Sequence, residues 1–289
     1  MLSVLKVEFE KLFRTKSFWI VLAFLSLITS AVAVTRSVSL AGSVGGVNPA
    51  VPKADNGYYF EDNSPYAISL YNVWIGSLVG DLLFTTVFYF ILPLAAALPF
   101  SFSLLDENRN GYLRQMSLKK GQQRYYLAKY LVTFCSGFLL AVIPLVINII
   151  ITACYIPAYT PDPLEQIYSG QYYGRYLSNI FYSNPFLFMM IFVLIPGIFC
   201  GLWADLSMCL SLFIQNKFVI IIVPYLFLFF KKAFFDTIFS NRISLELSPF
   251  YFMRGGVSSN IYIVAAILAV MFIVSLAITW IRGKNDDVF

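Results

Sequence analysis

The 289-residue chain contains no histidine. This absence excludes histidine-ligated metal centres, Ser-His and Cys-His catalytic pairs and histidine proton relays. Charged residues are also scarce, at 12% of the chain, whereas an ordinary soluble domain has about 25%. With 59% hydrophobic residues, the composition predicts an all-α integral membrane protein.

Motifs that would bind a metal or a nucleotide are missing as well. The four cysteines lie in or beside apolar segments and lack the paired spacing of a zinc site, so we interpret them as packing residues. No segment matches G-x-x-x-x-G-K-[ST], and no paired carboxylates suggest an active site. We therefore expect a non-catalytic chain with no cofactor of its own. The net charge of +5 does not indicate a nucleic-acid partner, because positively charged cytoplasmic loops of a membrane protein account for it.

Six apolar segments approach the roughly 20 residues that cross a bilayer. They predict one transmembrane domain over residues 1–289. The expected spans cover residues 17–34, 77–100, 127–151, 185–214, 218–235 and 261–281.

The distribution of positive charge predicts the orientation of these spans. Thirteen of the twenty Lys and Arg residues fall at the two ends of the chain, in the 101–129 region and at Lys217, all on one side of the predicted membrane. The other seven are spread over longer loops. Positive residues concentrate on the cytoplasmic side, so both termini are expected to be cytoplasmic.

Two further segments are expected to lie at the membrane surfaces. Residues 1–16 place several apolar side chains near one helical stripe, which predicts an amphipathic interfacial helix; the alternative is a solvated basic leader that only fixes topology. Residues 236–260 are too apolar for a free loop and too interrupted for a seventh span. They predict an outer re-entrant hairpin.

A few polar or small residues within the spans are candidates for a pathway or for helix packing. Asp205 shares a stripe of four-residue spacing with Gly197 and Gly201, so it should face the protein interior. It is either a polar point on a translocation path or a hydrogen-bonded packing residue. Asn148 predicts an interhelical hydrogen bond, and Asp81 is expected near the outer interface.

The run from residue 106 to 129, DENRNGYLRQMSLKKGQQRYYLAK, interrupts this apolar chain. It contains six Lys or Arg residues and two acids, both at its start. We interpret residues 101–126 as a cytoplasmic loop by which a soluble partner holds the membrane protein. The alternative is positive charge that only sets topology.

The order of these features resembles that of membrane subunits of type-2 ATP-binding-cassette (ABC) exporters over nearly the whole chain. The most specific part is 107–113, ENRNGYL, which is similar to the family pattern E-x-x-x-G-[TY]-L and is followed by Arg124 and by Ala128-Lys129. The family's usual proline before the downstream arginine is absent, because Leu-Lys-Lys-Gly occupies 118–121. Among such subunits, the chain looks most like small six-span permeases that export antimicrobial peptides or confer bacteriocin immunity.

The resemblance implies partners and roles. Two ATPase subunits, which would bind ATP and magnesium, would contact the 101–126 loop, and a second permease copy or a paralogue would complete the pathway. Membrane lipids and a peptide or other amphiphilic substrate would also be bound, in a bacterial cytoplasmic membrane. The residues implied in ATPase coupling are Glu107, Arg109, Gly111, Tyr112, Arg114, Lys119, Lys120 and Arg124, with Gln215, Asn216 and Lys217 as a second contact.

Two other classes of function remain open from the sequence. A secondary transporter or channel would work without ATP, and activity independent of nucleotide would mark it; no clear inverted repeat favours it. An integral-membrane lipid-modifying enzyme would need clustered acids or a nucleophile with its base. The isolated Asp81 and Asp205 lie on opposite predicted sides instead.

Overall fold

A computed structural model describes residues 2–44, 69–77, 82–113, 115–116, 121–158, 160–161, 177–238, 248–254 and 260–285. Within these ranges every regular element is helical and none is a strand, which confirms the predicted all-α class. The helices are α1 Leu2–Arg14, α2 Lys16–Val44, α3 Leu70–Val73, α4 Leu82–Ala97, α5 Ser103–Arg109, α7 Gln122–Tyr155, α8 Ser178–Ser183, α9 Pro185–Leu210, α10 Lys217–Ile238, α12 Pro249–Phe252 and α13 Ile261–Asn285.

Four helices are long and apolar enough to cross a membrane, which indicates a membrane-embedded protein. They are α7 and α9 over their whole lengths, α2 over Lys16–Val38 and α13 over Ile261–Arg282. The second and fifth predicted spans correspond to shorter apolar stretches, Leu83–Ala97 in α4 and Lys217–Phe230 in α10. The count of six spans therefore stays a prediction.

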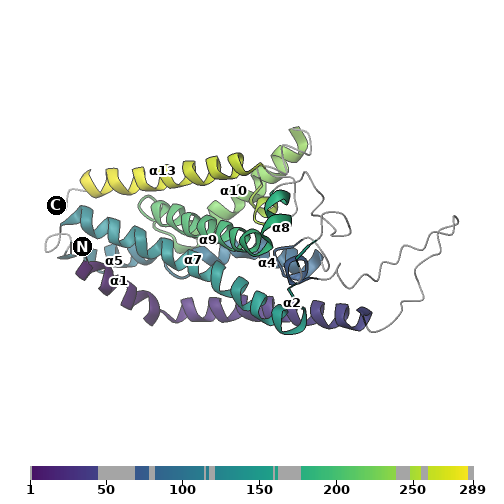
Figure 1. The fold of residues 1–289 in the computed structure, drawn as a ribbon. Helices are drawn as coiled ribbons and strands as arrows, with labels where there is room; N and C mark the ends of the chain where they lie inside the picture. The colour runs from purple at the N-terminus through teal and green to yellow at the C-terminus, as the bar shows by residue number, and fades with distance from the viewer. Residues whose placement is uncertain are drawn as a thin grey trace, which may run out of the picture.

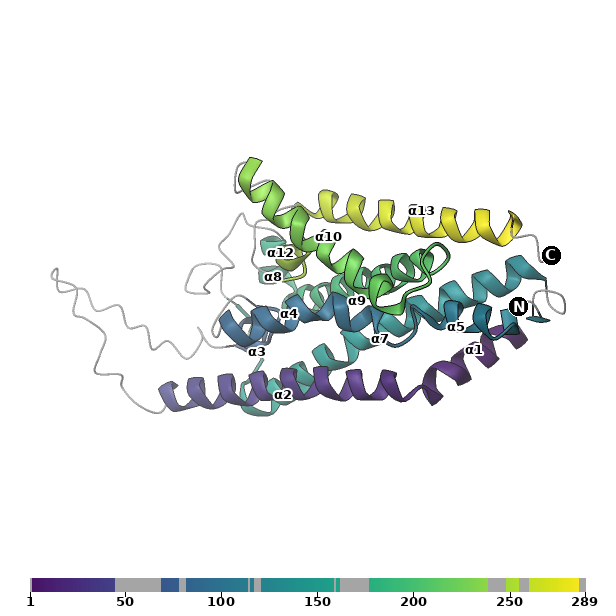
Figure 2. The same ribbon diagram turned by 180° about the vertical axis from the view of Figure 1, so that it is seen from behind.

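The long helices lie side by side in an elongated bundle (Figures 1 and 2). α7 and α9 pack against each other at its centre, α2 packs on α7, and α13 contacts both central helices from the opposite side. α4 packs on α9, and α1 packs on α7. Both ends of the chain lie at the same end of this bundle.

Glycines allow the two central helices to approach closely. A Cβ atom on Gly137 of α7 would lie 2.4 Å from the Cys200 carbonyl oxygen, and one on Gly201 of α9 would lie 2.9 Å from the Phe134 carbonyl oxygen. A Cβ on Gly197 would meet Val142 at 2.7 Å. Small residues at helix interfaces in membranes have this role, so the predicted glycine stripe is a packing surface against α7.

The first apolar helix is longer than predicted. α2 continues to Val44, whereas the sequence suggested an end at residue 34 and an outer loop over 35–76. Arg36, which seemed to belong to that loop, is buried and donates to the carbonyls of Val73 and Trp74 at 2.7 and 3.1 Å. Because the guanidinium finds acceptors within the fold, its charge does not end the helix.

The predicted hairpin over 236–260 is described only in part. α10 extends to Ile238, and the short helix α12 places Phe250 against Phe90 of α4, with ring centroids 5.1 Å apart. Phe252 packs against Phe199 of α9 at 5.7 Å. Residues 239–247 and 255–259 lie outside the described part of the chain, so the re-entrant shape stays a prediction.

Candidate functional site

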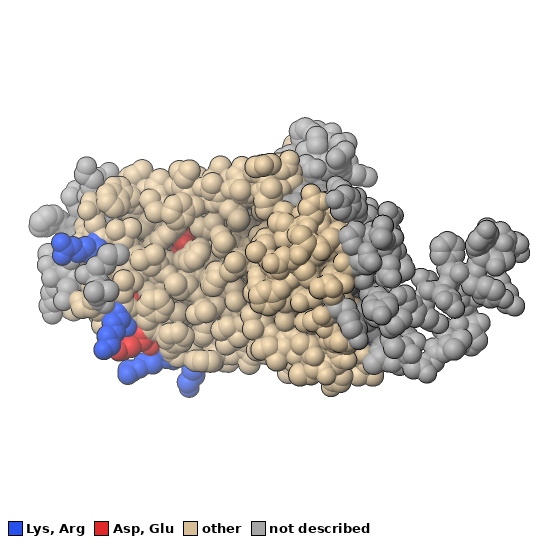
Figure 3. All heavy atoms as spheres, in the orientation of Figure 1, with Lys and Arg blue, Asp and Glu red and all other residues tan. Residues whose placement is uncertain are grey.

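The candidate site lies at the end of the bundle where both chain ends are found. We call it the charged end, formed by α1, α5, the first two turns of α7 and residues 215–217. On the face seen in Figure 3, the lysine and arginine atoms gather at this end. Charge therefore concentrates where the sequence predicted the 101–126 loop.

Local backbone geometry fixes the position of α5 between α4 and α7. The chain turns after α4, forms α5 over Ser103–Arg109 and then reverses at Gly111, where φ is +68°. Gly121, with φ of +84°, precedes α7. Only glycine adopts such angles readily, so the backbone conformation accounts for a glycine at position 111 of the predicted motif.

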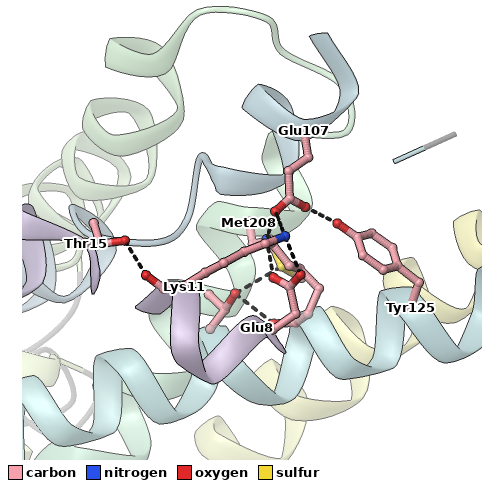
Figure 4. A network of polar contacts seen from close by, with 8 residues as sticks. Glu8, Lys11, Thr15, Glu107, Tyr125 and Met208 are labelled. Atoms are coloured by element: carbon pink, nitrogen blue, oxygen red, sulfur yellow. Dashed lines mark hydrogen bonds and ion pairs between the residues drawn. The ribbon is translucent and has the colours of Figure 1, made fainter. Parts of the chain in front are cut away.

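An ion-pair network joins α1, α5 and α7 (Figure 4). Lys129 Nζ of α7 lies 2.7 Å from Glu8 Oε2 of α1 and 2.8 Å from Glu107 Oε1 of α5. Lys11 Nζ of α1 lies 2.7 Å from Glu8 Oε1 and 2.8 Å from the same Glu107 oxygen. The Tyr125 hydroxyl donates to the other Glu107 oxygen. Two bases thus neutralise two acids across three helices.

Burial makes this network sensitive to the loss of any partner. The side chains of Glu8 and Lys129 are 0% exposed, that of Glu107 is 13% exposed and that of Lys11 is 32% exposed. A small apolar core around them includes Val4, Leu104 and Met208. Removing one member of a buried ion pair leaves an uncompensated charge, which is strongly destabilising.

The pKa shifts of the partly exposed members favour the charged forms. Burial acts to raise the pKa of Glu107, but Lys129 and Lys11 outweigh it, and the pKa lies below its ordinary value. Burial acts to lower the pKa of Lys11, yet its bonds to Glu107 and Glu8 raise it above its ordinary value. Both shifts follow from opposite charges within hydrogen-bond distance.

Aromatic rings extend the network toward the loop. Lys11 Nζ lies 3.9 Å from the centroid of the Tyr112 ring, and Lys129 Nζ lies 4.5 Å from that of Phe100. An ammonium group over a ring face is attracted to its π electrons. Tyr112 of the predicted motif therefore contacts α1 rather than standing free.

A second set of contacts joins α5 to the chain between α9 and α10. Arg109 Nη2 donates to the Gln215 carbonyl oxygen at 2.5 Å. Lys217 Nζ lies 2.6 Å from Asp106 Oδ1, with both side chains partly exposed. Asn216 Oδ1 accepts from the Phe218 amide at 3.0 Å at the start of α10. The two segments predicted from the sequence as contact points thus form one surface.

The remaining coupling candidates are placed only in part. Arg124 is exposed in the first turn of α7. Arg114, Lys119 and Lys120 lie outside the described residues.

One prediction about this loop stays open and another needs correction. Glu107 was expected to contact an ATPase; its carboxylate is bound by Lys11, Lys129 and Tyr125 within the chain, and its contact with an ATPase stays a prediction. Lys129, counted among the loop charges, is a fully buried residue of α7. Each group stabilises the loop internally, because a buried charge needs an opposite charge nearby.

Sequence reasoning missed Glu8 altogether. Glu8 lies one turn from both Val4 and Leu12, and all three are buried on the face of α1 that packs on α7. An acid at the centre of an apolar stripe was the available signal. The partner of Glu8, Lys129, lies 121 positions away in the sequence, and no local pattern predicts a pairing over that separation.

Asp205 lies deep in the bundle, as predicted, and is fully buried. Neither of its carboxylate oxygens has a hydrogen-bond partner among the described residues. Tyr130 of α7 lies beside it, but the Tyr130 hydroxyl is 3.0 Å from Ser275 Oγ of α13. Tyr130 is close enough to interact with the carboxylate, so both predicted roles of Asp205, a point on a translocation path and a packing residue, stay predictions.

Asn148 has a structural role. Its Oδ1 accepts from the Ile75 amide at 2.9 Å, and its Nδ2 donates to the Thr29 carbonyl of α2 at 2.8 Å. The predicted interhelical hydrogen bond is confirmed. Asp81, the other weak candidate, lies outside the described residues.

The arrangement connects α5 to neighbouring parts of the bundle by ion pairs and hydrogen bonds. Within the described ranges, no three His, Cys, Asp or Glu side chains come together as metal ligands would. What the geometry provides is a loop linked by charge to α1 and α7 and to the segment before α10. Comparison of the chain with protein-family models, with curated proteins and with solved structures gave no match.

Proposed function

We propose that this chain is the membrane subunit of an ABC exporter, with no catalytic residues of its own. In this proposal it crosses a bacterial cytoplasmic membrane six times with both termini in the cytoplasm. Two ATPase subunits dock on its charged end, and a second permease copy or a paralogue completes the pathway. The transported substrate is an amphiphilic molecule, with an antimicrobial or bacteriocin-like peptide as the leading candidate.

The observation that carries the proposal is the double attachment of α5. Glu107 links it to α1 and α7, while Arg109 and Asp106 link it to residues 215 and 217. A displacement of this loop would therefore be transmitted to α1, to α7 and to the segment at residues 215–217 at once. Energy can enter a transporter only through contacts that differ between two conformations, and a loop so attached can transmit such a difference.

Exposed groups beside this attachment could meet a soluble partner. Asn108, Arg109 and Gln115 are exposed on or just after α5, and Arg124 is exposed nearby at the start of α7. Basic groups on such a surface would pair with acids on an ATPase. The buried pairs hold the loop in shape while these residues remain accessible.

The proposal is tested by purifying the tagged chain in mild detergent from its native host and identifying proteins that elute with it. A stoichiometric partner with vanadate-sensitive ATP hydrolysis is the expected result. An intact chain that elutes alone and shows no nucleotide dependence in a transport assay would instead favour a channel or a secondary transporter.

A charge reversal at Arg124 sharpens this test. We expect Arg124→Glu to weaken binding of the ATPase at least about tenfold, since it replaces an attraction by a repulsion. Arg124→Lys, which keeps the charge, is the matched control and should bind nearly normally. Equal co-purification of all three proteins, with normal membrane insertion, would remove Arg124 from the docking surface.

A further inference from the structure

An apolar groove lies between α9, α10 and α13. It has a volume of about 770 Å³, within the range of small-molecule sites. α9 contributes Phe199, Trp203 and Leu206, and α10 and α13 form the other walls. Every lining residue in the described part of the chain is apolar or a cysteine, so hydrocarbon is the chemistry that fits the interior of the groove.

The groove follows α13 for most of a membrane crossing. Its lining includes Ile263, Ile267, Met271 and Ile278, which recur on one helical face. From Ile263 to Ile278 the helix rises about 22 Å. That length exceeds the roughly 15 Å of one hydrocarbon leaflet, so an acyl chain can lie along it.

A positive charge is held at one end of this groove. Arg282 lies one turn beyond Ile278, close to the C-terminal end of α13. Its guanidinium carbon is 4.6 Å from the ring centroid of Phe213, which itself lines the groove. Phe213 lies two residues before Gln215, so this is the charged end of the bundle.

We propose that the α9–α10–α13 groove binds one anionic phospholipid of the surrounding bilayer, with an acyl chain against Trp203 and the phosphate beside Arg282. Basic pockets between transmembrane helices bind anionic headgroups in this way. The inference does not depend on the proposed exporter function, because it needs only the membrane and these residues.

The composition of the groove favours a lipid over a second copy of the chain. Helix interfaces in membranes are rich in small residues that let backbones approach. This groove instead presents bulky side chains such as Phe213, Phe227 and Leu228, with Ala266 as the main small residue. A flexible chain fills such an irregular surface more readily than a rigid helix, and the guanidinium complements a phosphate.

Trp203 provides a reporter within the groove. The protein is placed in phosphatidylcholine vesicles containing lipids with brominated acyl chains, which quench tryptophan fluorescence on contact. The quenching of Trp203 is obtained by subtracting the fluorescence quenched in Trp203→Phe from that quenched in the wild-type protein. Trp203→Phe keeps an aromatic ring against Phe199. Brominated phosphatidylglycerol and brominated phosphatidylcholine are compared at equal mole fraction.

We expect Trp203 to be quenched with about a fivefold preference for the anionic lipid, which corresponds to about 1 kcal/mol for one basic residue near a membrane surface. Arg282→Gln should abolish this preference, and Arg124→Gln, which removes an exposed charge at the same end, should retain it. Ala266→Phe should reduce quenching by both lipids because the ring fills the groove.

Three results would overturn the proposal. Equal quenching of Trp203 by the two lipids, or loss of the preference in Arg282→Gln and Arg124→Gln alike, would mean that Arg282 does not select a headgroup. Absence of Trp203 quenching by either lipid would mean that lipid does not enter and that protein, such as a second copy, covers the groove.

Discussion

At the scale of single residues, Lys129 is the group on which most of the charged end depends. Its amine is fully buried and binds Glu8 and Glu107, which come from two different helices. An ammonium group buried in this way is stable only while its partners remain charged and in place. The residue therefore acts as an internal connector, although its position in the sequence suggested a loop cation.

Replacing Lys129 should destabilise the protein substantially. Lys129→Met leaves Glu8 buried without a full complement of opposite charge, and we expect a loss of about 3–5 kcal/mol in the free energy of unfolding. Unfolding in detergent, followed by circular dichroism, measures it. Lys6→Met, which removes an exposed lysine from the same end, should change stability little. A similar small effect for both variants would show that the network contributes nothing.

Glu107 should give the network a dependence on acid pH. Its pKa in the folded protein lies below the ordinary value of 4.5, so its contribution to stability is complete above pH 4.5 and is lost as the pH falls through the lower folded value. Lys11, whose pKa is raised above 10.5, keeps its contribution throughout the acid range. The difference in melting temperature between wild type and Glu107→Gln should therefore shrink on acidification below pH 4.5. A difference that stays constant would contradict the assignment.

At the scale of helices, the close approach of α7 and α9 sets the geometry of the centre. At Gly137 the atom facing a new Cβ is a backbone oxygen 2.4 Å away, whereas at Gly197 the nearest atom belongs to the Val142 side chain. Backbone cannot move without shifting the whole helix, but a side chain can change its rotamer. The two glycines are therefore not equivalent.

This difference predicts a graded response to alanine. Gly137→Ala should lower the free energy of unfolding by about 1–3 kcal/mol through overpacking. Gly197→Ala, the matched substitution on the facing helix, should lower the free energy of unfolding by a smaller amount. The same unfolding assay compares them, and a larger effect at Gly197 would show that the helices separate more easily than their side chains rearrange.

The elements themselves were largely predictable, but their connections were not. The apolar runs predicted each long helix of the described chain, because hydropathy measures the tendency of a segment to partition from water into lipid. The predicted end of the first apolar helix, at residue 34, was wrong because Arg36 donates to carbonyl groups 37 and 38 residues away. In the same way, Arg109 meets Gln215 across 106 residues. Such pairings depend on the folded arrangement, which no local pattern contains.

At the scale of the whole molecule, the outer helices present broad apolar faces. On α2 the exposed side chains include Trp19, Phe24 and Leu27, and on α13 they include Val270 and Ile273. In a bilayer these faces meet lipid or another protein. For the proposed function, we assign the α2 face, which corresponds to the first predicted span, to the second permease copy.

Cysteine cross-linking distinguishes the two faces. In a background without the four native cysteines, we expect Phe24→Cys on α2 to form a dimer under mild oxidation, because the two copies meet there. Val270→Cys on α13, similarly exposed at 59% compared with 53% for Phe24, is the matched control and should remain monomeric. The reverse result would place the subunit interface at the α13 groove.

The net charge of the ion-pair network at the charged end determines how the network responds to the membrane voltage. Glu8, Lys11, Glu107 and Lys129 sum to zero charge within one compact unit. Moving a single elementary charge across the membrane involves about 2.3 kcal/mol per 100 mV, but a neutral unit that moves rigidly exchanges no such work with the field. A rigid shift that carries α1, α5 and the start of α7 together therefore moves no net charge of this network through the field, and we expect such a movement to run equally in energised and de-energised cells.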